Sequence, residues 1–198
     1  MSEKRTKGWH FLQTNKHLRW GTKEVVKPGG HYSCKGKISL CENGLHASKT
    51  ILDALYYAPG PVVCRVEVWG DVVRSSDKLA GRNRAVLWML DATNVLHEFA
   101  CRCAEDALAL VKKPDGRSLA AIEAKRAWMR CEITDEELAA AGEAAGEAAW
   151  EARVAARDAA GAAAGAAAGE AAWEAAWDAQ KCRLTSMTAA AHAKEATQ

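Results

Sequence analysis

The sequence predicts an α+β fold: a small, mostly antiparallel sheet with helices, followed by a long alanine-rich helix or helical hairpin. Two observations support this prediction. Strand patterns come first along the chain and helical patterns follow, an order that favours α+β over a doubly wound α/β fold. From residue 139 to residue 179, 23 of 41 residues are alanine, the best helix former. We therefore expect a compact domain over residues 1–131 and an Ala/Gly-rich helical segment with a frayed C-terminus over residues 132–198.

Apolar and aromatic residues predict four strands, of which the last is the clearest. In that strand Cys64, Val66 and Val68 point to one face and alternate with residues that point to the other. An Asn43-Gly44 pair favours a tight reversal after the third strand. The four segments are residues 9–13, 25–26, 37–41 and 62–73.

Helical spacing predicts three helices in the compact domain. The first is capped by Ser48 and ends before the turn at residues 58–61. The second begins after Asp91, and we expect a helical chain rather than a strand after Asp77. The third is capped by Ser118. Their apolar positions are Ile51, Leu52, Leu55 and Tyr56 in the first helix; Val95, Leu96, Phe99, Cys103 and Leu110 in the second; and Leu119, Ile122 and Met129 in the third.

The alanine-rich segment begins with a capping box, in which Thr134 and Glu137 each bond the other's backbone N–H. One helix over residues 135–180 would be about 69 Å long. Glycines oppose this, since each costs about 1 kcal/mol relative to alanine. Either the helix breaks near residues 161–169 into a hairpin, or the glycines permit close packing between helices. Trp173 and Trp177 share one face, whereas Trp150 lies about 140° around the axis of a straight helix.

Charge is distributed unevenly, although the formal net charge is only +2. Residues 1–37 contain nine Lys/Arg and two Glu, so 9 − 2 = +7, and residues 135–178 contain two Arg and ten Asp/Glu, so 2 − 10 = −8. These segments attract each other, face different partners, or are simply solvated surfaces.

Location follows from the cysteines and from hydropathy. Seven cysteines at irregular spacing, after an N-terminus without an apolar signal, predict free thiols in a reducing cytoplasm. No apolar run approaches the roughly 18 residues of a membrane span, so we expect no membrane partner.

Most catalytic classes are not indicated. His31, Cys34, Cys41 and His46 lie close in sequence but match no zinc spacing, so we expect no metal. The chain has no Gly-x-Ser-x-Gly motif and no phosphate-binding glycine loop. We do not expect the basic N-terminal region with its interleaved aromatic residues to bind nucleic acid, because the strand spacing of these aromatics is typical of core packing. A cluster of three cations either lines a pocket or solvates a loop, and we favour the loop: Lys78, Arg82 and Arg84.

Several segments resemble small phage and prophage proteins of unknown function. They are residues 9–12, Cys41 with residues 44–48, residues 53–55 with 57–60, Asp77-Lys78 and residues 87–89. Those proteins also tend to end in Ala-rich tails with Trp and acidic residues. The resemblance implies a phage-accessory origin and no particular chemistry.

A second resemblance is to poly(ADP-ribose) polymerase-type ADP-ribosyltransferases. Residues 44–47, a helix ending in Tyr57 and the strand at residues 62–70 are similar to the middle of that family. The resemblance implies that His10 holds the NAD ribose and that His46 stands where a tyrosine stacks on nicotinamide. The family's glutamate-bearing strand has no visible counterpart after Asp77, which puts transferase activity in doubt.

We therefore expect a phage-encoded accessory protein that binds and inhibits or redirects a bacterial host or defence protein in the host cytoplasm, without its own catalysis or cofactor. The expected partner-binding residues are Trp150, Trp173 and Trp177. The alternative is an NAD-binding, ADP-ribosyltransferase-like domain that modifies a host target, with His10, His46 and Tyr57 in its cofactor site. A third hypothesis is a homo-oligomer formed through the Ala/Gly-rich helix.

Overall fold

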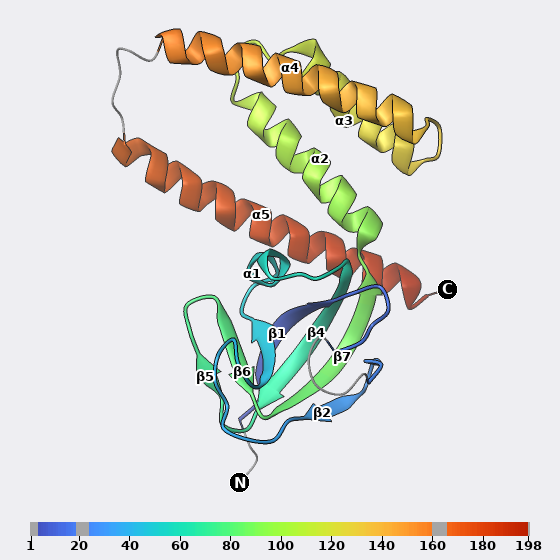
Figure 1. The fold of residues 1–198 in the computed structure, drawn as a ribbon, viewed down its shortest axis with the longest axis vertical. Helices are drawn as coiled ribbons and strands as arrows, with labels where there is room; N and C mark the ends of the chain where they lie inside the picture. The colour runs from blue at the N-terminus through green and yellow to red at the C-terminus, as the bar shows by residue number, and fades with distance from the viewer. Residues whose placement is uncertain (1–3, 19–23, 160–165, 198) are drawn as a thin grey trace. The chain divides into compact units, whose positions relative to one another are not determined.

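A computed structural model describes residues 4–18, 24–159 and 166–197 (Figure 1). The chain divides into two compact units. Unit 1 comprises residues 1–95 and 180–198, and unit 2 comprises residues 96–179. A compact unit is not the same as an independently folding domain, so the domain boundary after residue 131 stays a prediction.

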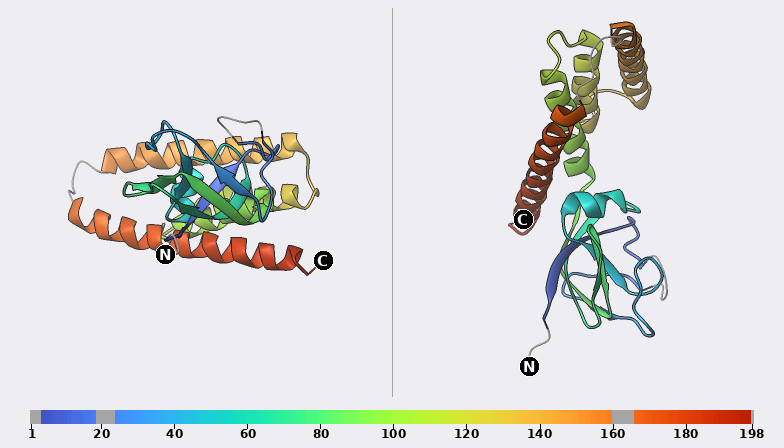
Figure 2. Two further views of the ribbon diagram at one scale, coloured as in Figure 1. Left: turned by 90° about the horizontal axis from the view of Figure 1, so that it is seen from below. Right: turned by 90° about the vertical axis from the view of Figure 1, so that its left-hand side faces the viewer.

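Unit 1 is built on a seven-stranded antiparallel sheet with the strand order β2-β7-β4-β1-β3-β6-β5, and its strands twist strongly (Figures 1 and 2). With the helices, this confirms the predicted α+β class. The strands are β1 (Thr6–Leu12), β2 (His31–Ser33), β3 (Leu45–Ser48), β4 (Val62–Trp69), β5 (Val73–Arg74), β6 (Lys78–Gly81) and β7 (Asn83–Asp91).

The sheet is continuous on one side of β1 and splits on the other. β1 pairs with β4 along its whole length, from Thr6 opposite Val68 to Leu12 opposite Val62. In contrast, the described residues of β1 and β3 pair at one position, Trp9 opposite Ser48. Beyond that pair the two strands part. Helix α1 (Ile51–Tyr56) packs against both of them and so borders the split.

One face of the sheet forms an aliphatic core. Its central members are on β4, where Cys64, Val66 and Val68 have no accessible surface. Because opposed residues of an antiparallel pair share a face, His10, which lies opposite Cys64, points to this side of the sheet. The strand predicted over residues 62–73 is therefore present as β4, with the predicted alternation.

The other face of the sheet is aromatic. Trp9 and Trp88 meet edge to face with ring centroids 5.6 Å apart, and Trp88 stacks on His192 at 4.4 Å. His192 belongs to α5 (Ala166–Glu195), in which Leu184 and Thr188 are fully buried. The last part of α5 is therefore a structural component of unit 1. The helix continues to Glu195, and the fraying of the C-terminus stays a prediction.

Unit 2 contains most of α2 (Thr93–Ala109), α3 (Gly116–Met129) and α4 (Asp135–Ala159). Arg126 of α3 makes ion pairs with Glu98 and Glu105 of α2. Arg117 at the start of α3 bonds Glu151 of α4. Among the described residues of this unit, the buried side chains are Phe99, Cys101, Ile122 and Ala148, and the ion pairs join partly exposed side chains of neighbouring helices.

Two predictions about residues 37–48 are wrong. Residues 37–41 do not form a strand; their backbone bonds are made within a loop, where the Asn43 side chain donates to the carbonyls of Lys35 and Lys37 at 2.9 Å. Ser48 is not a helix cap, because it ends β3. Thr50 caps α1 instead, in a capping box with Asp53.

The expectation of a helical chain after Asp77 is also wrong, because β6 and β7 occupy residues 78–91. β7 lies between β2 and β4 in the sheet. A strand in this position is covered on both faces. It therefore does not show the alternation of apolar and polar residues by which strands are recognised in a sequence. The helix after Asp91 is present as α2.

The later helices follow the predicted pattern in part. Phe99 and Ile122 are buried as expected, whereas Leu110 and Leu119 are exposed. Asp115 rather than Ser118 caps α3. The predicted capping box of α4 is confirmed: Thr134 Oγ1 accepts from the Glu137 N–H at 3.2 Å, and Glu137 accepts from the Thr134 N–H at 2.8 Å.

The alanine-rich segment contains two helices, α4 and α5, rather than one described helix over residues 135–180. The glycines at which a break was predicted include Gly161 and Gly165, which lie outside the described residues. Within the described ranges, no helix is both long enough and apolar enough to cross a membrane.

Candidate functional site

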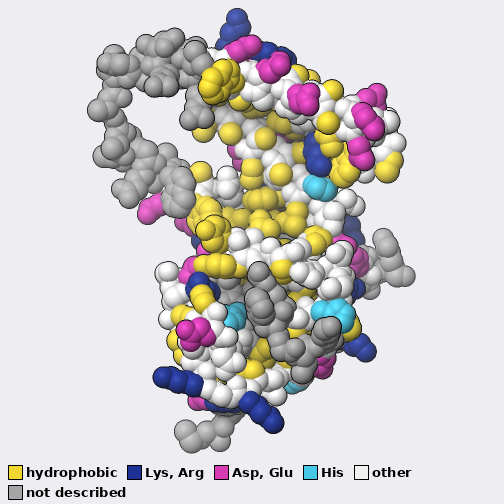
Figure 3. Space-filling model, in the orientation of Figure 1, with side chains coloured by type: hydrophobic (Ala, Val, Ile, Leu, Met, Phe, Trp, Pro, Cys, Tyr) yellow, Lys and Arg dark blue, Asp and Glu magenta, His cyan; other side chains and the backbone are white. Residues whose placement is uncertain are grey.

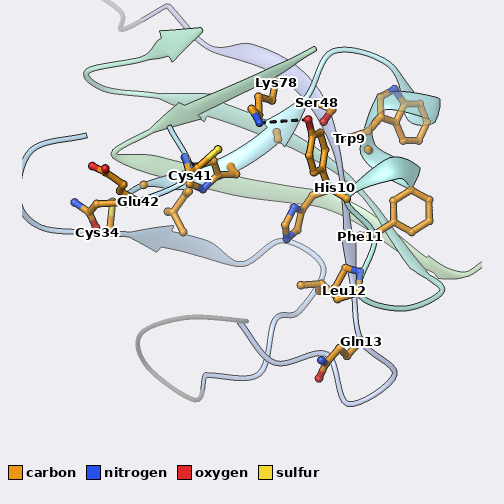
Figure 4. Close-up of a pocket in the computed structure, with 18 of the residues that line it drawn as sticks. Trp9, His10, Phe11, Leu12, Gln13, Cys34, Cys41, Glu42, Ser48 and Lys78 are labelled. Carbon is orange, nitrogen blue, oxygen red and sulfur yellow. Dashed lines mark hydrogen bonds between the residues drawn. The ribbon is translucent and has the colours of Figure 1, made fainter. Parts of the chain in front are cut away.

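A cavity of about 620 Å³ lies where β1 and β3 part. Its wall includes residues 9–13 of β1 and the following turn, residues 41–48 of the β3 region, and the side chains of Tyr57 and Lys78 (Figure 4). Sites for small ligands and cofactors have volumes of about 300–1,000 Å³. The split in the sheet thus creates a space of the size that a nucleotide-like molecule needs.

The three residues predicted to contact a cofactor all line this cavity. His10 comes from β1, His46 from β3, and Tyr57 from the end of α1. These residues come from three separate elements, and the fold brings them together. That they bind a cofactor stays a prediction.

His10 is the residue best placed to meet a ligand. Its ring lies on the opposite side of β1 from the rings of Trp9 and Phe11 (Figure 4). The pKa of His10 is lowered well below its ordinary value, first by burial and then by the positive charge of Arg84 and by His46. His10 is therefore a neutral imidazole at pH 7, able to donate one hydrogen bond and accept another.

His46 is held in place by its own chain. Its Nε2 accepts a hydrogen bond from the Cys41 N–H at 3.0 Å, which requires the neutral ring to bear its proton on Nδ1. Burial lowers the pKa of His46, and a backbone hydrogen bond to Gly44 opposes that shift. Because both edges of the ring are engaged, only its faces remain for a ligand, as stacking would require.

Tyr57 is part of a hydrogen-bonded group at the rim. Its hydroxyl donates to Asp77 Oδ2 at 2.5 Å and accepts from Lys78 Nζ at 3.2 Å. The bond to Asp77 raises the pKa of Tyr57, and the same bond lowers the pKa of Asp77 to about 2. Tyr57 is thus a neutral phenol whose orientation is fixed by charged neighbours on either side.

Arg84 is one of the three cations for which the sequence left two alternatives, a pocket or a solvated loop. The preference for a solvated loop is wrong for this residue, since it lies in β7 and is 2 % exposed. Its Nη1 donates to the carbonyl oxygen of His46 at 2.8 Å. Burial lowers the pKa of Arg84 to about 10. Recognising β7 as a strand would have placed this side chain on a buried face.

Arg82, by contrast, is paired at the surface with Asp71, and Lys78 lies on the cavity rim. The strand that was thought absent after Asp77 exists as β7, but its residues include no glutamate. The element that would orient a ribose in the resembled transferases therefore has no equivalent at this place in the sheet.

The cysteines and possible metal ligands complete the inventory of reactive groups. All seven cysteines are free, and burial raises the pKa of the Cys64 thiol to about 12, so it is protonated. Within the part of the chain that the structure describes, no three His, Cys, Asp or Glu side chains gather as ligands for a metal ion.

The predicted partner-binding tryptophans lie in the long helices. Trp150 of α4 is 66 % exposed. Trp177 of α5 is half-buried, and the side chain of Trp173 lies outside the described part. Binding through any of them stays a prediction.

Comparison with known proteins delimits the N-terminal region. Residues 8–98 match a family described as a domain of unknown function (DUF7666). The match includes the cavity-lining residues from Trp9 to Lys78. No curated protein and no solved structure matches the chain significantly. These comparisons assign neither the phage nor the ADP-ribosyltransferase resemblance, so both enter below as proposals.

Proposed function

We propose that the N-terminal region binds NAD, or a closely related nucleotide, in the cavity between β1 and β3. One observation supports this most strongly. His10, His46 and Tyr57, the residues singled out by the ADP-ribosyltransferase resemblance, converge on one cavity of nucleotide-like size. If the similarity of these short segments to the transferases were accidental, there would be no reason for the three residues to line one cavity.

The chemistry of the lining fits a dinucleotide. The neutral imidazole of His10 can bond ribose hydroxyls as donor or acceptor. The face of the His46 ring offers a surface on which a planar base can stack. Lys78 Nζ lies 4.6 Å from the centroid of the Tyr57 ring, so Tyr57 contributes with Lys78 to the wall of the cavity. Transfer of ADP-ribose to a host target is the narrower form of the proposal, and the missing glutamate on β7 argues for binding without efficient transfer.

The test is a calorimetric titration of NAD into the full-length protein and into two variants. We expect saturable binding to the unmodified protein. His10→Ala should weaken the affinity for NAD about tenfold or more, because it removes one good hydrogen bond to a buried group. His31→Ala is the matched control, because His31 is exposed on β2 and does not line the cavity. Absence of saturable heat with NAD, or an equal loss in both variants, would contradict the proposal.

A second candidate function is capture of a bacterial host or defence protein by a phage-encoded accessory protein. It is favoured by α4, where the exposed ring of Trp150 lies near a row of exposed acidic residues, visible along α4 in Figure 3: Glu143, Glu147 and Glu151. Tryptophan is a common anchor at protein interfaces. A second copy of the chain would satisfy the same surface.

This candidate is tested with Trp150→Ala rather than with deletion of the tail. Deleting residues 135–198 would remove Leu184 and Thr188 from unit 1 and so confound loss of binding with loss of folding. Trp150→Ala should abolish capture from bacterial lysate or, for a homo-oligomer, lower the mass measured by light scattering. Unchanged capture and unchanged mass would show that Trp150 of α4 is not part of an interface.

A further inference from the structure

The sheet of unit 1 contains a buried positive charge without an anion. Arg84 is 2 % exposed, and in the described part of the chain its Nε has no hydrogen-bond partner. Its one recorded hydrogen bond is to a neutral acceptor, the His46 carbonyl. None of the ion pairs between described residues involves Arg84.

The groups that surround this guanidinium are neutral. Cys64 and Tyr32 are the neighbours whose electrostatic effect favours the charged form of Arg84. Cys64 is a protonated thiol, because burial raises its pKa to about 12. The Tyr32 hydroxyl is already occupied by the Lys27 N–H at 2.8 Å. A buried charge with an unpaired donor is costly, and such groups concentrate at sites that bind ligands.

Arg84 lies next to the cavity wall, although it is not one of the lining residues. Arg84 bonds the carbonyl of His46, which lines the cavity, so the guanidinium lies one residue behind that wall. Its charge reaches His10 and His46, since it is among the causes that lower the pKa of both. Lys78 adds a second cation at the rim. Among the described lining residues, Glu42 bears the one carboxylate, and Ser39 Oγ donates to it at 2.9 Å.

We propose that the cavity takes a phosphate-bearing ligand and that Arg84 is the counter-charge that positions the phosphate beside neutral His10. The inference rests on the proposed nucleotide site and names the part of the ligand that the site selects. A guanidinium is suited to this role, because it stays charged even when it is buried. Arg84 acts as a positioning residue. The phosphate of a ligand in the cavity supplies the negative charge that the buried guanidinium lacks.

The test compares ligands that differ in phosphate, using the full-length protein. Calorimetry should show ADP binding at least about tenfold more tightly than adenosine, with the difference shrinking as salt concentration rises. In Arg84→Met the preference for ADP should vanish, and in Arg84→Lys part of it should remain. Arg74→Met is the control, since Arg74 is exposed and donates to Thr6 and to the Val72 carbonyl, neither of which lines the cavity.

A second measurement decides the matter if Arg84→Met does not fold. Inorganic pyrophosphate added to the wild-type protein should raise the pKa of His10, followed by NMR of its ring protons, because a nearby anion favours the imidazolium. Equal affinity for ADP and adenosine, together with an unchanged His10 titration in pyrophosphate, would overturn the inference.

These outcomes are separable from those of the NAD titration. Preference for ADP without NAD binding would support the phosphate site and contradict the proposed cofactor. NAD binding without any preference for ADP over adenosine would support the cofactor and contradict the role of Arg84.

Discussion

Each compact unit contains one arginine with little exposed surface, and the two arginines differ in whether carboxylates pair with them. In unit 2, Arg126 keeps a fifth of its side chain exposed and is bonded by Glu98 and Glu105. In unit 1, Arg84 is almost fully buried and has no carboxylate partner among the described residues. Unit 1 also has an aliphatic core centred on β4, and in the described part of unit 2 the buried apolar side chains include Phe99 and Ile122. This difference shows that the sheet of unit 1 holds a buried arginine without a carboxylate partner next to a cavity. In unit 2 the arginine is neutralised by glutamates of a neighbouring helix.

The largest expected effect tests whether unit 1 depends on its apolar core. Leu184→Ala should reduce the free energy of unfolding by about 2–5 kcal/mol, because Leu184 is fully buried and the truncation leaves a cavity. Leu110→Ala is the matched control, since Leu110 is 88 % exposed and should change stability by less than about 0.5 kcal/mol. Urea denaturation measures both. A small effect of Leu184→Ala would mean that α5 is not part of the core of unit 1.

The second prediction sets the two arginines against each other. Arg126→Met should lower the free energy of unfolding of unit 2, because it leaves Glu98 and Glu105 without their shared cation. Arg84→Met should be neutral or stabilising without ligand, because it removes an uncompensated buried charge. Hydrogen exchange at amides of α3 and β4 reports on each unit separately. Equal destabilisation by the two substitutions would contradict the proposed difference between the two arginines.

The third prediction concerns pH and the cavity of unit 1. The folded-state pKa values of His10 and His46 lie below the ordinary value of about 6.5. Above pH 6.5 these residues are neutral in both states, and their contribution is fully present. As the pH falls below 6.5, the unfolded chain takes up protons that the folded chain does not, so the free energy of unfolding decreases, by about 1 kcal/mol for each unit of pKa depression.

Substitution shows whether His10 is a source of that slope. His10→Gln should make the decrease in stability between pH 6.5 and pH 5 shallower, whereas His31→Gln should leave it unchanged because His31 is exposed. The measurement is the thermal midpoint as a function of pH. A slope unaffected by His10→Gln would place the titrating groups elsewhere.

The smallest expected effect concerns the start of α4. Thr134→Ala removes the side-chain acceptor that bonds the Glu137 N–H and should cost about 0.5–1 kcal/mol in unit 2. Thr134→Ser keeps the acceptor and should cost little. Hydrogen exchange near residues 135–138 detects the fraying. Equal protection in the two variants would show that packing, not capping, holds this helix end.

Sequence patterns predicted the fold where local chemistry decides it. The alternation in β4 and the capping box at Thr134 were read correctly because each is encoded within a few residues. The strand at residues 37–41 was wrong because the loop makes its own hydrogen bonds through Asn43. β7 was missed because its strand character depends on pairing with β2 and β4, which no local pattern records.

The candidate site could be predicted only in part for the same reason. His10, His46 and Tyr57 were named from a resemblance, but their convergence depends on β1 and β3 parting after one residue pair. Arg84 could not be found without β7, since an arginine in a charged stretch usually faces solvent. The unpaired charge is visible only when the neighbours that fail to neutralise it are known.

The most direct test of the central claim is an NMR titration of NAD that follows the ring protons of His10 and His46 together with the indole of Trp150. If the cavity between β1 and β3 is the nucleotide site, the two histidine signals will shift with a common, saturable dependence on NAD while the Trp150 signal stays unchanged. Histidine signals that do not move, or shifts confined to Trp150, would contradict the account.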